Sequence, residues 1–391
     1  MFSINRFQQL LQQLPQAIFE QSVREHQADK HNKGFDRWQH LKVMIYAQFS
    51  GASSLRTLCA TFNGHANAHY HLGMQKIKRA TLADANRKTN PQILMQTLQA
   101  LMSTAQRRIR KEMAPVLHLL DSTGITLKGP HFDAWTFASK TRHTQGLKLH
   151  VLYDSSTQAP LWCEFSAANV NDVQMAAHIT LQAGRHYVFD KGYCSYAWWH
   201  DIDKAGAFFV TRLKSNAAVV VDKKNALGED CQQVLADELV RFKHRHSRGG
   251  HVNVYEKALR RITVARDGKK RPLVLATNDL STPAQEIAQH YKARWGVELF
   301  FKWIKQHLRI KRFLGRSENA VKIQVLTALI AYLLVVLYQR VHAPGQSLWL
   351  LLSELSQSLF QRPMSEQQHR SSYQRRRRCR LMMEKQGDFF A

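Results

Sequence analysis

The sequence predicts an α/β protein in which a mixed sheet is flanked by helices and preceded by a helical amino-terminal region. Two short apolar runs, residues 115–121 and 186–190, have the length of buried strands, and each ends in an aspartate. Residues 291–305 instead carry their apolar side chains at helical spacing. Residues 3–60 also show helical periodicity, without the alternation that is typical of strands.

Two aspartates stand where the predicted strands end. Asp121 follows Val-Leu-His-Leu-Leu and precedes Ser-Thr-Gly, and Asp190 follows His-Tyr-Val-Phe and precedes Lys-Gly-Tyr. A single aspartate in such a place is usually explained as a turn former. Two of them, followed along the chain by an acid-bearing helix, favour a shared carboxylate site at the edge of the sheet.

The polar face predicted for residues 291–305 carries one acidic side chain together with several basic ones. Tyr291, Arg294, Glu298, Lys302 and Lys305 are separated by three, four, four and three positions, which places them on one side of a helix. A solvated face with ordinary salt bridges is one interpretation. The other is functional, because arginine and lysine bind phosphates and a lone glutamate among them suits a divalent cation.

These residues carry a resemblance to a known family. The order Tyr, two residues, Arg, three residues, Glu, six residues, Lys resembles the signature of the fourth family of insertion-sequence transposases, a branch of the DDE transposases. The motifs Asp-Ser-Thr at Asp121, Asp-Lys-Gly-Tyr at Asp190 and Phe-Val-Thr-Arg ending at Arg212 also resemble motifs of that family. The resemblance implies that the α/β region has the ribonuclease H-like fold.

The resemblance also implies the roles of the site residues. Asp121, Asp190 and Glu298 would be the catalytic residues and the metal ligands. The metal would be Mg²⁺, which prefers oxygen ligands, and Mn²⁺ is expected to substitute for it. Two such ions provide the hydroxyl nucleophile and neutralise the departing oxygen in phosphodiester cleavage. The residues expected to contact DNA are Tyr291, Arg294, Lys302, Lys305, Arg212 and Lys191.

The implied function is cut-and-paste DNA transposition, in which the ends of an insertion element are cleaved and joined to a target. The implied partners are double-stranded DNA, both as terminal inverted repeats and as target, and a second copy of the chain in a homodimeric synaptic complex. An alternative from another class is a non-catalytic DNA-binding protein or repressor that retains the fold. The presence of acids at all three positions argues against that alternative.

The chain divides into three predicted regions. Residues 1–111 are expected to form a helical DNA-binding domain, in which residues 38–60 are either a helix-turn-helix or a plain helical pair. Residues 112–345 are expected to form the catalytic domain and to fold without the first 111. The gap between Asp190 and Glu298 is longer than one connection needs, so a β-rich insertion is expected at about 215–275, with strands near 219–221, 251–255, 261–264 and 272–276. Residues 346–391 are expected to form a helix and a basic tail.

Composition agrees with a polyanionic partner. The chain has 56 Lys and Arg against 29 Asp and Glu, a net charge of +27, and its pI is about 10.1. Five scattered cysteines with no CxxC pair indicate neither a zinc ribbon nor a disulfide framework. The apolar run at 325–337 is expected to be a buried helix, because it is shorter than a membrane span. We therefore expect no membrane association and a location in the bacterial cytoplasm, with the nucleoid.

Overall fold

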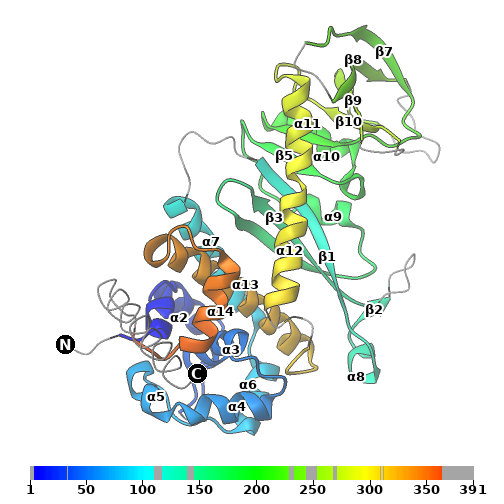
Figure 1. Ribbon diagram of the computed structural model, residues 1–391. Helices are drawn as coiled ribbons and strands as arrows, with labels where there is room; N and C mark the ends of the chain where they lie inside the picture. The colour runs from blue at the N-terminus through cyan, green and yellow to red at the C-terminus, as the bar shows by residue number, and fades with distance from the viewer. Residues whose placement is uncertain are drawn as a thin grey trace, which may run out of the picture.

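The computed structural model of the protein describes residues 4–32, 34–109, 117–138, 145–228, 233–243, 253–266, 271–308, 310 and 312–362. A helical half and a half built on one long sheet lie side by side (Figure 1). In chain order the helices are α1 (Arg6–Leu11), α2 (Gln16–Glu25), α3 (Arg37–Phe49), α4 (Leu55–Gly64), α5 (Ala66–Leu72), α6 (Arg79–Lys88), α7 (Pro91–Ile109), α8 (Pro130–Asp133), α9 (Asp172–Ala176), the 3₁₀-helix η1 (Lys191–Tyr193), α10 (Tyr196–Lys204), α11 (Ala284–Ala293), α12 (Trp295–His307), α13 (Glu318–His342) and α14 (Leu348–Ser358).

The centre of the sheet confirms the predicted fold class. Strand β1 (Leu117–Thr126) pairs antiparallel with β3 (Gln145–Asp154), which pairs antiparallel with β4 (Ala159–Ala167). On its other side β1 pairs in parallel with β5 (His186–Phe189), and β5 pairs in parallel with β6 (Phe208–Arg212). A three-stranded antiparallel meander followed by two strands parallel to its first strand is the ribonuclease H-like arrangement. The short strand β2 (Phe137–Ala138) pairs with the start of β3.

The region between Asp190 and Glu298 lengthens this sheet. Strand β10 (Leu273–Thr277) pairs antiparallel with β6, and β9 (Leu259–Val264), β8 (Val234–Phe242) and β7 (Val219–Lys224) follow toward the edge. We refer to these four strands and their connections as the insertion. Three of its strands lie where the sequence predicts them.

The predictions for the rest of the insertion are wrong in two places. The part of 251–255 that the structure describes is not a strand, because the side chain of Asn253 accepts a hydrogen bond from the backbone N–H of Tyr255 at 3.0 Å and turns the chain. Strand β8 takes the place between β7 and β9. The sequence does not predict β8, because charged residues such as Asp237 and Glu238 are unusual in strands. In the structure these two acids are compensated by ion pairs of 2.6 Å with Arg260 and Arg261 of β9.

The two faces of the sheet bury different sets of apolar side chains, as the alternation of a strand requires. Leu119 and Val188 belong to a core that includes the inner faces of α11 and α12. Leu120 and Phe189, the next residue in each strand, pack in a second core with the tryptophans of α10. Helices therefore cover both faces of the parallel strands, and the carboxyl ends of these strands are held between α10 on one side and α12 on the other.

Helix α13 is the centre of the helical half. It is buried along most of its length and packs against α1, α3, α6 and α7 from the amino-terminal third and against α14. A buried hydrogen bond of 3.3 Å from Nε2 of Gln48 to Oγ1 of Thr327 ties α3 to α13. By length and composition α13 is apolar enough to cross a membrane, yet 94% of its most apolar window is buried inside the protein. The predicted buried helix is thus longer than the run at 325–337, and it serves as a core helix.

This packing bears on the predicted division of the chain. The predicted boundary near residue 112 falls among residues 110–116, which lie outside the described part. The packing of α13 against α3, α6 and α7 is an argument against the expectation that residues 112–345 fold without the first 111. The division into three regions remains a prediction.

Removal of residues 1–111 is expected to leave a protein that does not fold. The deletion exposes the apolar faces of α13 that α3, α6 and α7 cover, and exposed apolar area costs about 25 cal/mol per Å². We expect residues 112–391 to be insoluble when produced alone, and to become soluble when residues 1–111 are produced with them. A soluble 112–391 with a cooperative unfolding transition would contradict this expectation.

Candidate active site

The pairing of β1 with β5 brings Asp121 and Asp190 together. The last pair in the parallel ladder is Leu120↔Phe189, and the two aspartates are the next residues in the two strands. Asp190 follows the end of β5, as the sequence predicts. Asp121 does not stand at a strand end, because β3 continues to pair with β1 through Asp121↔Val151 and extends it to Thr126. The adjacent register nevertheless places both carboxylates on one edge of the parallel pair.

The third acid, Glu298, reaches this edge from α12. Residues 291–305 form two helices rather than one, because Arg294 is a turn residue that ends α11 and begins α12. Its backbone keeps helical dihedral angles (φ −52°, ψ −30°), so the two helices run nearly in line (Figure 1). Gly296 lets α12 approach the sheet closely, since a Cβ atom there would lie 3.3 Å from Cδ1 of Leu119. The helix thereby carries Glu298 to the side of β1.

Arg294 joins two of the three acids. Its Nη1 atom lies 3.2 Å from Oδ2 of Asp121, and its Nη2 atom lies 2.5 Å from Oε1 of Glu298. The Arg294 side chain is 14% exposed, so the guanidinium is largely shielded from water. The sequence predicts that Arg294 and Glu298 lie on the same side of a helix, and in the structure these two side chains form an ion pair. It also predicts a DNA contact, and here the guanidinium is occupied by the two acids.

Asp190 has partners of its own. Arg212, the last residue of β6, donates to Oδ1 of Asp190 from Nε at 2.9 Å and from Nη2 at 2.5 Å. The hydroxyl of Tyr291 donates to the same oxygen at 3.4 Å. Burial opposes ionisation of Asp190, but the hydrogen bonds from Arg212 and from the backbone of Lys191 lower the pKa of this carboxyl below its usual value. Two of the residues predicted to contact DNA, Arg212 and Tyr291, therefore hold an acid in this structure.

Asp121 is in the opposite electrostatic situation. The pKa of this carboxyl is raised to about 6, chiefly by burial and also by the neighbouring carboxylates of Glu298 and Asp190, although the backbone N–H of Ser122 and the charge of Arg294 act to lower it. A carboxylate in such surroundings gains from an additional cation. The residues that line the site therefore have the chemistry of a divalent-cation site. In the side-chain positions of the described residues, no three His, Cys, Asp or Glu side chains converge closely enough to ligate one ion.

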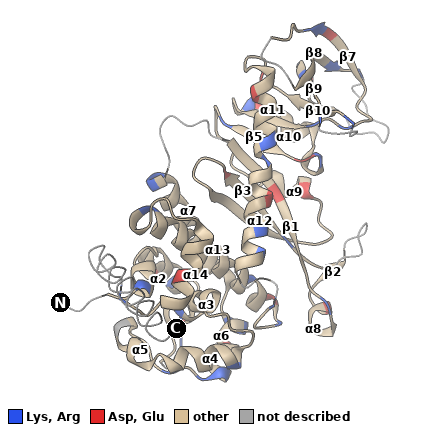
Figure 2. Ribbon diagram, viewed as in Figure 1, with Lys and Arg blue, Asp and Glu red and all other residues tan. Residues whose placement is uncertain are grey.

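Two cavities meet at Asp121. The larger, of about 1120 Å³, is lined by Asp121, Asp190, Lys191, Arg212 and further residues of the insertion. The smaller, of about 400 Å³, is lined by Asp121, Glu298, Lys302 and Lys305 with parts of α12 and β1. Lys191 and Lys302, both exposed, line the larger and the smaller cavity respectively. Figure 2 shows acidic positions of α9 and α12 beside β1, with basic positions on α12 and among the insertion strands.

The comparison with known sequences decides the family. A sequence profile of the transposase DDE domain matches residues 113–334. The chain belongs to the transposase DDE domain family. A second profile, named only as a domain of unknown function (DUF4372), matches residues 4–75 of this transposase.

Two named relatives agree with this assignment. A putative transposase, y4zB, of Sinorhizobium fredii is 41% identical over 258 residues, which cover 65% of this chain and 69% of that protein. A probable transposase for the insertion sequence element IS5377 of Geobacillus stearothermophilus is 26% identical over 266 residues, 67% of this chain and 68% of that protein. A cryo-EM structure titled as a piggyBac transposase synaptic complex with hairpin DNA has a TM-score of 0.45 and 14% identity, and the match covers 85% of this chain and 75% of that one.

The protein is therefore a DNA transposase and an enzyme of the DDE type, as the sequence predicts. Divalent-metal dependence and DNA binding are general properties of this family.

The three described cysteines, Cys59, Cys163 and Cys194, are buried and free of disulfide bonds.

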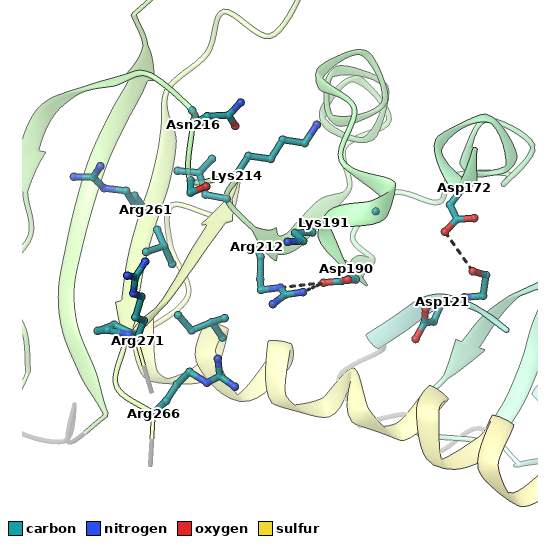
Figure 3. A pocket seen from close by; sticks show the side chains of 18 residues that line it. Asp121, Asp172, Asp190, Lys191, Arg212, Lys214, Asn216, Arg261, Arg266 and Arg271 are labelled. Carbon is teal, nitrogen blue, oxygen red and sulfur yellow. Dashed lines mark hydrogen bonds and ion pairs between the residues drawn. The ribbon is translucent and has the colours of Figure 1, made fainter. Parts of the chain in front are cut away.

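Sequence reasoning did not identify a fourth acid beside the transposase site. Asp172, the first residue of α9, lines the larger cavity with Asp121 and Asp190 (Figure 3). Its carboxylate lies 2.8 Å from Nζ of Lys148 and accepts a hydrogen bond of 3.3 Å from the Ser122 hydroxyl. Its sequence context, Asn-Val-Asn-Asp before a short helix, is that of a helix cap. No local sequence pattern indicates that it lies beside β1.

In the metal-free transposase, Asp121→Asn is expected to raise the free energy of unfolding above pH 6. The pKa of Asp121 changes from 3.8 to about 6 on folding, so the folded state binds more protons between these values and loses stability as the pH rises through them. Asparagine should remove a cost on the order of 3 kcal/mol, and the difference from the natural protein should vanish below about pH 4. Urea unfolding with a chelator, at a series of pH values, measures both quantities.

Asp190→Asn is the matched comparison with the opposite expected sign. The pKa of Asp190 is lowered on folding, so its ionised form stabilises the protein at neutral pH and this contribution is lost as the pH falls through the acid range. We expect Asp190→Asn to lower the free energy of unfolding near neutral pH. Changes of the same sign in the two variants would contradict this account of the site.

Proposed function

We propose that this transposase cleaves DNA at the ends of its insertion element and joins the ends to a target with Asp121, Asp190 and Glu298 as its catalytic acids. The observation that carries the proposal is the adjacent register of Asp121 and Asp190 at the β1–β5 edge, with Arg294 joining Asp121 to Glu298. Membership of the fourth insertion-sequence family is part of the proposal. It is supported by the spacing of Tyr291, Arg294, Glu298 and Lys305.

The donor set favours Mg²⁺ as the metal, with Mn²⁺ as a substitute. All three acids offer oxygen ligands, which Mg²⁺ prefers, and Mg²⁺ keeps several waters and so needs few protein ligands. The single charge of Arg294 now compensates two carboxylates, both partly buried. When bound, divalent ions activate the attacking hydroxyl and neutralise the leaving oxygen of the phosphodiester.

The chain's own residues would then divide their tasks. Arg212 and Tyr291 hold the Asp190 carboxylate in one orientation, which is a positioning role. Arg294 compensates Asp121 and Glu298 in the metal-free protein, and its guanidinium is suited to bind a phosphate in two-pronged geometry once it leaves the acids. Lys302, on the exposed side of the smaller cavity, is suited to contact the DNA backbone.

Recognition of the element's terminal repeats is proposed for the amino-terminal helices. Helix α3 is mostly buried. Ser54 is the N-cap of α4, because its side chain accepts a hydrogen bond from the backbone N–H of Thr57 at 3.1 Å. Helix α4 has exposed residues that include Arg56. This arrangement favours α4 as the helix that reads DNA if the pair is a helix-turn-helix. Double-stranded DNA, as terminal repeats and target, and a second copy of the chain are the proposed partners, and the bacterial cytoplasm is the proposed location.

Neutral replacements of the three acids test the proposed site. We expect Asp121→Asn, Asp190→Asn and Glu298→Gln each to lower strand cleavage in Mg²⁺ by at least about a thousandfold, because several kcal/mol of charge stabilisation depend on the metal. Binding to end DNA should stay within a few-fold of the natural protein. Glu318→Gln, an exposed acid paired with Lys322 on α13, is the control and should cleave normally. Cleavage at the natural rate by any of the three variants would remove that acid from the site.

Replacement of Arg294 tests whether its guanidinium takes the place of a metal cation. Arg294→Ala should lower the melting temperature in the presence of a chelator, because two neighbouring carboxylates lose their counter-charge. Mg²⁺ should then raise the melting temperature more in Arg294→Ala than in the natural protein, since the competing cation is absent. An equal rise in both proteins would contradict the exchange of Arg294 for metal.

A further inference from the structure

The larger cavity has a strongly basic wall that the proposed chemistry does not use. Opposite the acids, it is lined by Arg261, Arg266 and Arg271 of the insertion, and by Lys214 after β6. Figure 3 shows these arginines across the cavity from Asp121 and Asp172, with Arg212 and Asp190 between them. We refer to Arg261, Arg266 and Arg271 as the arginine wall.

Two of the three arginines have no acidic partner among the described residues. The charge of Arg261 is compensated by Glu238 at 2.6 Å. Arg266 and Arg271 are exposed, and the described part of the chain holds no ion pair for either. The excess positive charge of the wall therefore lies with Arg266 and Arg271.

The register of the insertion brings these two charges together. Leu273↔Val264 is the last pair of the β9–β10 ladder, and Arg266 and Arg271 each lie two residues beyond it, at the same end of the two strands. Like charges at neighbouring strand ends repel each other. A polyanion bound between the two arginines would relieve this repulsion, because each guanidinium can bind a phosphate in two-pronged geometry.

The position of the wall relative to the acids indicates which part of the DNA it meets. Helix α12 runs from the insertion side toward the helical half (Figure 1), so Lys302 and Lys305 lie on the helical side of Glu298. Lys305 is about 10 Å beyond Glu298 along the helix axis, at 1.5 Å per residue. We refer to the smaller cavity, lined by Lys302 and Lys305, as the lysine cavity. Asp121 borders both cavities, so a DNA backbone cleaved there would pass from the lysine cavity to the arginine wall.

We propose that the arginine wall binds the donor DNA that flanks the element, on the far side of the phosphodiester that is cleaved. This inference rests on the proposed function, in which the helical half and the lysine cavity hold the element's own end. The flank would be held by its phosphates and without regard to its sequence, because Arg266 and Arg271 are exposed charges and phosphate contacts carry no sequence information. Release of the flank after cleavage leaves the same wall open.

The experiment compares two DNA duplexes in the absence of divalent metal, so that neither is cut. One is the terminal repeat that bounds this gene's own element, ending at the cleavage position; the other is the same repeat continued into donor flank. Binding constants are measured over a range of salt concentrations. For the natural protein we expect a steeper salt dependence with the flanked duplex, since each additional phosphate contact adds about 0.9 to the slope.

The variant Arg266→Ala/Arg271→Ala should lose that difference. We expect its slope on the flanked duplex to fall by about two units, while binding to the unflanked duplex stays unchanged. Unchanged binding to the unflanked duplex also shows that the variant is folded. Arg266→Lys/Arg271→Lys keeps the charges and should keep the steeper slope. Lys223→Ala/Lys224→Ala removes two exposed charges from β7, outside the cavity, and is the matched control.

Two results would overturn the inference. One is an equal slope for the alanine variant and the natural protein on the flanked duplex, and the other is an equal loss on both duplexes, which would assign the wall to the element itself. Failure of the proposed function is a separate result. It would appear as no preference of the natural protein for the terminal repeat over unrelated DNA of the same length.

Discussion

The carboxylate of Asp121 is partly buried in the sheet, and the site is arranged around its charge. The β1–β5 register sets Asp190 beside it, and α12 adds Glu298 on the other side. Three carboxylates this near to each other are stable only with cations among them. In the structure Arg294 and Arg212 are those cations, so the residues that resemble a DNA-binding signature also hold the acids together.

In the proposed function the arginines would have two successive partners. Arg294 and Arg212 are largely or partly shielded from water, which strengthens their ion pairs with the acids in the absence of metal. When a divalent ion and a DNA phosphate bind together, the carboxylates would pair with the metal and the arginines with the phosphate. The change of partners would couple metal binding to DNA binding without a large movement of the backbone.

The architecture around the site explains how DNA can approach it from two directions. The helical half is built from both ends of the chain, because α13 lies among helices of the amino-terminal third. The insertion is joined to the catalytic strands by the β6–β10 ladder, so it continues their sheet as one surface. The acids therefore stand between a helical half on one side and a basic extension of the sheet on the other.

The sequence by itself determined the fold class, the order of the strands that bear Asp121 and Asp190, and the helical face that carries Glu298. These features depend on local apolar periodicity and on the spacing of a few polar residues, which are properties of neighbouring positions. Only the tertiary structure decided that Arg294 joins Asp121 to Glu298, that Asp172 approaches Ser122, and that α13 belongs with the first helices. Each of these contacts joins residues far apart in the chain, and which partner a charged side chain takes depends on burial and on the placement of whole elements.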